Sequence, residues 1–203
     1  MNESELLAVA KRPTVEWLES CFGPGSLWRP AEAELPVRLE DAGTRAFLTT
    51  VGVPAVRLDF MGYDSAGLKA KGMWEEDPDE LFGNRYPDDD SEPACWSYCV
   101  GMVQLLHLMV RGDSGTVEIY DPDGWDHAAG YGGHAADSLP ELIGALALIA
   151  RCGHRLTDED GDTDADALLD ELTGRLELLG QGPEESSLWE GVLENLRDEY
   201  GDQ

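Results

Sequence analysis

The strongest constraint on the fold is an almost continuous apolar run from Leu142 to Ile149. Ser138 precedes the run, at a position where a serine side chain can cap the free amides of a helix. Pro140 suits the first turn, and Glu141 stands where a capping-box carboxylate belongs. A helix that is apolar nearly all round must be buried. The run therefore predicts a helix that begins after Ser138, ends near Cys152, and packs against a sheet.

The middle of the chain predicts strands. Three closely spaced segments, 96–101, 103–110 and 115–120, are rich in β-branched, aromatic and apolar residues. Residues 111–115, Arg-Gly-Asp-Ser-Gly, suit a hairpin turn between the last two. An earlier segment, 55–60, alternates apolar with charged residues, which is typical of a half-buried strand. Three consecutive strands joined so closely favour an antiparallel meander.

Helical periodicity flanks these strands on both sides. It predicts helices over 14–22, with Thr14 as the cap, and over 42–51, then two acidic amphipathic helices over 164–179 and 186–200. The predicted fold class is α+β, with an antiparallel meander flanked by N-terminal and C-terminal helices. The length of 203 residues suits a single domain spanning 1–203, with 157–203 as an acidic helical part.

Charge is the outstanding feature of the composition. The chain has 42 Asp and Glu against 14 Lys and Arg, a formal net charge of −28. Such a field repels phosphate backbones and anionic lipids, so we expect no direct binding to nucleic acid or to a membrane surface. It attracts cationic partners and speeds their encounter. Solubility alone is the alternative explanation of the acidity.

The acids gather in particular places. Residues 75–92 hold nine acids and one Arg, together with prolines, which predicts a loop rather than a core element. Residues 121–137 are rich in glycine and also predict a loop. Residues 157–203 hold 16 acids and two Arg.

No sequence motif points to catalysis or to a cofactor. GxSxG, Walker and strand–GxGxxG–helix motifs are absent from the sequence. Acid pairs are so frequent that no general acid and base can be selected. Cys95 and Cys99 are expected to be packing groups, and His107, in an apolar strand, a core histidine. We predict that the protein is not an enzyme and uses no cofactor.

Metal binding is not predicted either. His127 and His134 lie among aspartates, but their spacing matches no common zinc motif. An EF-hand loop starting at Asp158 would place Thr163 where glycine belongs and Leu169 where glutamate belongs. A metal-dependent hydrolase that uses the two histidines and nearby aspartates remains the alternative from another functional class.

The sequence predicts a cytoplasmic location. It starts without a basic segment followed by an apolar run, so no signal peptide is expected. No apolar stretch reaches the roughly 18 residues that suggest a membrane span. None of the 4 cysteines forms a CxxC pair, so free thiols in a reducing compartment are expected.

Five short segments, in their order along the chain, resemble the SUKH superfamily, and more narrowly its SUKH-4 subgroup of bacterial immunity proteins. Thr44–Pro54, Thr-Arg-Ala-Phe-Leu-Thr-Thr-Val-Gly-Val-Pro, is similar to the family's TRxFLxxVGLP stretch and is the most specific. The others are the segments Phe22–Leu27, Gly115–Asp121, Ser138–Leu142 and Trp189–Leu193. The chain departs from the family pattern in the long glycine-rich loop 121–137.

This resemblance implies a sheet wrapped by helices, no catalysis, and neutralisation of a cognate toxin in a bacterial polymorphic toxin or toxin–antitoxin system. Such toxins are frequently nucleases or nucleic-acid deaminases, whose clefts are basic because they handle phosphate. An acidic surface could dock there, with a few aromatic anchors. The candidate partner-binding residues are Trp74, Glu75, Glu76, Asp77, Asp79, Glu80, Tyr86, Asp88, Asp89, Asp90, Asp123, Trp125, Asp126 and Tyr131.

Three questions stay open at this point. A regulatory or interaction module of the same fold, without a toxin partner, is the alternative function. The contact could be formed by the acidic loops or by the acidic C-terminal helices, and the oligomeric state is not determined.

Overall fold

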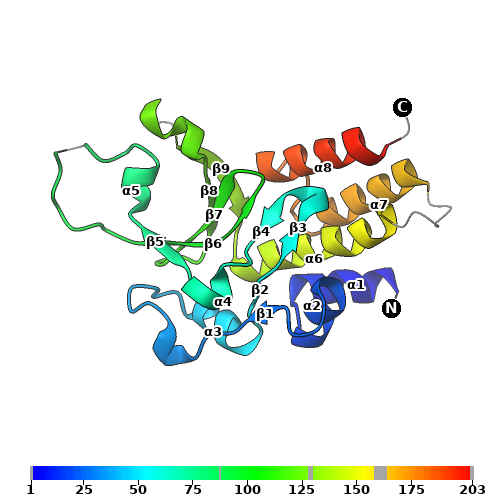
Figure 1. Cartoon of the computed structure of the whole chain (residues 1–203), viewed down its shortest axis with the longest axis horizontal. Coiled ribbons are helices and arrows are strands. Elements are labelled where there is room, and N and C mark those ends of the chain that lie inside the picture. The colour runs from blue at the N-terminus through cyan, green and yellow to red at the C-terminus, as the bar shows by residue number, and fades with distance from the viewer. Residues whose placement is uncertain (1, 87, 128–129, 158–163, 202–203) are drawn as a thin grey trace.

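A seven-stranded antiparallel sheet forms the centre of the molecule (Figure 1). The computed structural model describes residues 2–86, 88–127, 130–157 and 164–201, with only the backbone of 125–127. Strands follow the order β3-β4-β6-β7-β8-β9, and β5 pairs with β6 beside β4. Their bounds are Arg57–Leu58 (β3), Tyr63–Asp64 (β4), Trp74–Glu76 (β5), Ser97–Val103 (β6), Leu106–Arg111 (β7), Val117–Tyr120 (β8) and Tyr131–Ala136 (β9). A separate two-stranded sheet joins β1 (Leu27–Trp28) to β2 (Val53–Pro54).

The apolar run forms the central helix α6 (Leu139–Leu156), which begins where predicted but continues past the predicted end near Cys152. Every residue from Leu142 to Ile149 is buried. Ser138 is the N-cap residue, but its side chain makes no capping hydrogen bond, so that part of the prediction is wrong. Pro140 has no N–H, which removes one of the two amides that a cap side chain usually reaches.

Several other helices pack around α6. The predicted helices are confirmed as α2 (Val15–Phe22), α3 (Ala42–Thr50), α7 (Ala165–Leu178) and α8 (Ser187–Tyr200). A further helix, α1 (Glu3–Lys11), was not predicted; Asn2 and Glu5 form a capping box at its start. The helices α1, α2 and α7 pack on α6, and α8 packs on β9. The α+β class with an antiparallel meander is therefore confirmed.

The predicted strand 55–60 is mostly wrong. Only Arg57–Leu58 is extended, and Asp59–Met61 forms a 3-10 turn, η2. Gly62 ends this turn in the left-handed region, with φ 66°, which reverses the chain into β4. Two further short elements precede and follow: η1 (Glu32–Glu34) and the helix α4 (Leu68–Lys71).

Both segments predicted as loops contain regular structure. Residues 75–92 hold most of β5 and the short helix α5 (Pro78–Leu81). Residues 121–137 hold the 3-10 helix η3 (Pro122–His127) and the edge strand β9. Local propensity missed the two strands because pairing stabilises them from outside the segment: β5 pairs with β6, and β9 with β8.

The side chains of α8 close the free edge of β9. The hydroxyl of Ser186 donates to the His134 carbonyl at 2.6 Å, and that of Ser187 donates to the Gly132 carbonyl at 3.2 Å. The Trp189 indole, fully buried, donates to the Ala135 carbonyl at 3.2 Å and to Gln181 Oε1 at 2.8 Å. The C-terminal helix is thereby fixed to the sheet by both packing and polar contacts.

The two faces of the sheet belong to different hydrophobic cores. Leu108 and Val110 of β7 join the large core that contains α6. Met109, between them, points to the opposite face, called here the outer face, because side chains alternate along a strand. There it meets Tyr120 of β8 and Leu81 and Phe82 from α5, which together form a small second core. The segment 75–92 therefore covers part of the outer face.

Candidate partner-binding surface

The acidic segment, residues 75–92, is anchored at its beginning by β5 and α5. Asp77 caps α5: its Oδ1 accepts from the Asp79 amide at 3.0 Å. Its Oδ2 lies 2.7 Å from Arg85 Nε, an ion pair whose geometry is not that of a directed hydrogen bond. Asp77 is only 4% exposed. The structure therefore places the Asp77 carboxylate inside the fold, where it holds α5, and not on the exposed surface with the other candidate acids.

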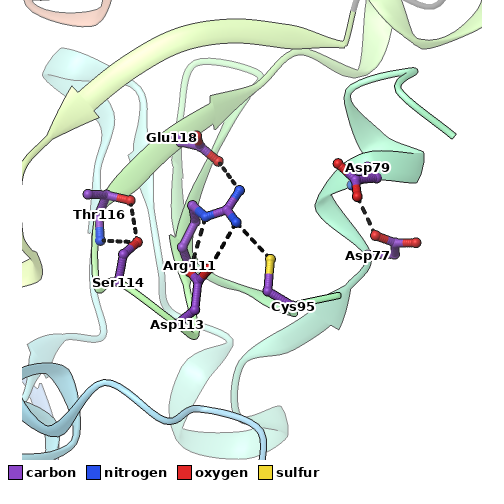
Figure 2. A network of polar contacts seen from close by, with 8 residues as sticks. All are labelled: Asp77, Asp79, Cys95, Arg111, Asp113, Ser114, Thr116 and Glu118. Carbon is purple, nitrogen blue, oxygen red and sulfur yellow. Dashed lines mark hydrogen bonds and ion pairs between the residues drawn. The ribbon is translucent and has the colours of Figure 1, made fainter. Parts of the chain in front are cut away.

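A polar cluster around Arg111 anchors the chain where it returns to the sheet (Figure 2). Arg111 donates from Nε and Nη2 to both oxygens of Asp113, at 3.1 and 3.0 Å, and from Nη2 to Cys95 Sγ at 2.8 Å. Its Nη1 lies 3.7 Å from Glu118 Oε2. Burial raises the pKa of the Glu118 carboxyl, while the nearby guanidinium opposes that rise. Cys95 is thus a fixed point at the end of the acidic segment.

Between these anchors the chain projects beyond the sheet (Figure 1). Arg85 closes the projection internally by donating to the carbonyls of Asp89 and Ser91. Among the described residues of the acidic segment, only Asp77 and Glu92 are in ion pairs, the latter with Arg38 at 3.1 Å. The other carboxylates are exposed or half-buried and form no ion pair within the described part of the chain: Glu75, Glu76, Asp79, Glu80, Asp88, Asp89 and Asp90.

Aromatic side chains lie beside these acids on the outer face. The Trp74 ring is 41% exposed and stands 5.5 Å from His107 and 6.3 Å from Tyr120, centroid to centroid. Its Nε1 donates to Glu76 Oε1 at 3.0 Å. Burial raises the pKa of the Glu76 carboxyl. A partly exposed indole next to a partly desolvated carboxylate is suited to contact a basic protein surface.

The structure brings the two segments proposed for partner binding together. Phe82, after α5, meets the ring of Tyr131, on β9, edge-on at 5.1 Å. Gly130 lies so close to α5 that an added Cβ would come within 2.1 Å of the Leu81 carbonyl oxygen. Tyr131 is 50% exposed, and Asp123 on η3 is exposed. The segments 75–92 and 121–137 therefore border one surface.

The remaining candidate residues differ in their placement. Tyr86 is 78% exposed on the projecting part of the acidic segment. Glu75 is exposed but faces away from Trp74 and Glu76, because neighbours on β5 alternate. The side chains of Trp125 and Asp126 lie outside the described residues.

Sequence reasoning missed the residues on which the aromatic side chains rest. His107 is half-buried on the outer face, so the expectation of a core histidine is wrong. Its Nδ1 lies 3.8 Å from Cys99 Sγ, and burial lowers the pKa of the imidazole while it raises that of the thiol. The alternation His107, Met109, Arg111 along β7 was the available signal for this face.

The described side chains do not form a metal site. No group of three or more His, Cys, Asp or Glu side chains is placed to hold an ion within the described part of the chain. His134 Nε2 contacts Asp137 Oδ1 at 3.1 Å, and the side chain of His127 lies outside the described residues. Residues 158–163 of the aspartate-rich stretch are also outside them.

Two other expectations concern the compartment. Cys21, Cys95, Cys99 and Cys152 are free thiols. Across residues 2–86, 88–127, 130–157 and 164–201, every helix lacks the combined length and hydrophobicity needed to cross a bilayer.

A sheet with helices on one face, and an acidic, aromatic outer face partly covered by α5, defines a protein of the α+β class. The chain belongs to the SUKH-4 immunity protein family, whose model matches residues 14–195. No curated protein and no solved structure matches the chain significantly. The family match begins at the cap of α2 and ends within α8, so it includes the whole outer face.

Proposed function

We propose that the protein neutralises a cognate bacterial toxin by binding it directly, without catalysis, in the cytoplasm. Membership of an immunity protein family supports the immunity role and implies a toxin partner. The finer proposal is that the toxin domain is basic, such as a nuclease or nucleic-acid deaminase with a cleft for phosphate. A formal charge of −28 favours that kind of partner over an acidic one.

The observation that carries the proposal is the row of carboxylates without cationic partners beside exposed aromatic rings. Ion-paired acids are already neutralised locally, whereas unpaired ones extend a field toward an approaching cation. Asp88, Asp89 and Asp90 are exposed at the projecting part of the acidic segment. Trp74 and Tyr131 supply partly exposed aromatic area nearby, the residue type that most often anchors interfaces.

Charge and aromatic rings have separate roles in this proposal. Exposed carboxylates steer the encounter and raise the association rate, and salt screens them over about 8 Å at physiological ionic strength. The aromatic rings lose their contact with solvent in the complex and thereby slow its dissociation. An acidic surface of this kind would compete with nucleic acid for a basic cleft.

The test is capture of the partner followed by a growth assay. The tagged protein, expressed in its own cells, is expected to retain a toxin domain through washing at low ionic strength, and to release it at high ionic strength. Co-expression with that domain is expected to restore growth that the domain alone arrests. Recovery of only non-toxin partners, or growth arrest that persists despite a soluble complex, would contradict the proposal.

A further inference from the structure

A pocket opens on the outer face at the edge of β6, where two short strands, β4 and β5, pair with different parts of β6. On one side of β6, β4 pairs with Met102 and Val103, and β5 pairs with residues 97–99. Neither strand covers Val100 and Gly101, where β6 has a bulge opposite β7. The resulting open pocket has a volume of about 630 Å³ and is bordered by α4 and the residues that follow it. This volume lies within the roughly 300–1,000 Å³ typical of binding pockets.

The walls of the pocket are mainly apolar and deformable. Its principal wall residues are Leu68, Met73, Trp74, Cys99, Met102 and His107. Methionine side chains are flexible and polarizable, so they adapt to the shape of an inserted group. The Cys99 thiol and His107 imidazole are held mainly in their neutral forms, because burial raises the pKa of the first and lowers that of the second. An apolar occupant therefore meets no fixed charge on these walls.

The charged groups of the pocket are one cation and one anion. Lys71, at the end of α4, is exposed and lines the pocket, so a guanidinium or ammonium inside it would meet a like charge. Asp64 lines the pocket from β4, and its Oδ2 lies 3.9 Å from Arg57 Nη1. Next to the pocket, Glu76 accepts a hydrogen bond from Trp74, at the start of the acidic segment. Lys71 and Asp64 balance each other, so the pocket offers no net charge to an occupant, whereas cations are favoured beside it, along the acidic segment.

We propose that this pocket receives one bulky apolar side chain of the toxin domain, carried on a basic segment whose cations face the acidic segment. The inference rests on the proposed function and names the contact that slows dissociation. Trp74 joins the two parts of the site, since it forms a wall of the pocket and bonds to Glu76. Energetic anchors on one partner tend to pair with pockets on the other.

Filling the pocket tests the proposal. Met102 is half-buried in the pocket wall and does not belong to either core, so Met102→Trp occupies the space while leaving the cores intact. We expect Met102→Trp to weaken toxin binding about tenfold or more, through faster dissociation, in surface plasmon resonance with the captured toxin domain. The matched control is Leu105→Trp, in the turn three residues on, which is 69% exposed and outside the pocket; it is expected to bind as the wild type does. Circular dichroism verifies that both variants fold.

A charge variant at the exposed rim identifies the occupant without disturbing the walls. Lys71→Glu is expected to leave toxin affinity unchanged or to raise it, because the flanking cations gain an attraction. A loss of binding on Lys71→Glu would mean that an anionic group occupies the pocket, and would overturn the proposal. Wild-type affinity in a folded Met102→Trp variant would also overturn it, although the proposed function would stand.

Two further outcomes distinguish a failure of the pocket proposal from a failure of the proposed function. A small molecule retained by the purified protein, seen as added mass in native mass spectrometry and displaced in Met102→Trp, would assign the pocket to that molecule and overturn the proposal. Failure to recover any toxin domain would remove the proposed function, and this inference with it.

Discussion

The acidic segment and the C-terminal helices α7 and α8 are both rich in carboxylates, yet their surroundings differ. In α7 and α8, the two arginines bond to acids: Arg175 contacts Glu3 at 2.8 Å and Glu171 at 2.5 Å, and Arg197 contacts Asp170 at 3.2 Å. Their apolar stripes, including Leu172 and Trp189, are buried in the large core. Only two described carboxylates of each region are in ion pairs, Glu92 and Asp77 in the acidic segment and Glu171 and Asp170 in the helices. The difference is that the acidic segment rests on the small second core.

This contrast shows that net charge alone does not indicate a binding surface. Acids on the solvent side of an amphipathic helix accompany a buried stripe that already explains why the helix is there. Acids that project from the sheet and lie beside exposed rings have no such structural explanation. We therefore favour the acidic segment over the C-terminal helices as the partner contact.

The largest expected effect is the loss of stability on removing Trp189. Its side chain is fully buried and bonds to the sheet edge, so Trp189→Ala should cost about 3–5 kcal/mol of unfolding free energy. Trp74→Ala, at a 41% exposed position, should cost much less while weakening toxin binding. Urea unfolding with binding measurements on the pair checks this. Equal losses of stability would contradict the division into a structural and a binding region.

The second largest expected effect is local unfolding of the acidic segment in the Asp77→Ala variant. This change removes the α5 cap and leaves Arg85 nearly buried without its carboxylate, so about 2 kcal/mol of local stability should be lost. Hydrogen exchange should accelerate over residues 78–86 and stay unchanged in α8. Asp77→Asn, which retains a capping oxygen, should open less. Global unfolding in Asp77→Ala would mean that the two cores are not independent.

Charge reversal compares the two acidic regions directly. Changing Asp88, Asp89 and Asp90 to lysine should slow toxin association about tenfold at low ionic strength, with the difference shrinking as salt is added. The matched control reverses three exposed acids on one side of α8: Glu190, Glu194 and Asp198. That control should slow association less. An equal or greater loss in the control would move the contact to the C-terminal helices.

The smallest effect is a difference in pH dependence. Burial raises the pKa of Glu76, so ionisation of this carboxyl opposes folding. Glu76→Gln should therefore have a higher melting temperature than the wild type at pH 7. This difference in melting temperature should disappear as the pH falls toward 4.5. The hydrogen bond from Arg175 lowers the pKa of Glu3, so its ionised form favours folding. Glu3→Gln should therefore melt lower at pH 7, with that gap closing below pH 4.5. Thermal melts across pH distinguish the two signs.

The sequence predicted the large core better than the small one. The run in α6 and the spacing of the strands 97–120 carry strong local patterns, so the central helix and the meander could be inferred. β5 and α5 could not, because Glu, Asp and Pro have low strand propensity, and these elements depend on contacts of Leu81 and Phe82 with distant strands. Their stability comes from register and packing, which a single sequence does not reveal.

The candidate surface was predicted in part for the same reason. Trp74, Tyr131 and the acids stood out as aromatic or charged residues in polar segments, and the structure places segments 75–92 and 121–137 side by side. The pairing of Trp74 with His107 depends on the registers of β5 with β6 and of β6 with β7. Those registers rest on contacts between distant residues, so the pocket between β4 and β5 was not foreseeable.

The separation of the two cores has a consequence for how the protein can change over generations. Leu81, Phe82, Met109 and Tyr120 hold the acidic segment on the sheet apart from the core around α6. Effects of substitutions at distant sites add independently. Mutations that alter the projecting carboxylates can therefore accumulate without lowering the stability of the sheet and helices. Under the proposed function, the acidic segment can change together with the toxin while the sheet and the helices stay conserved.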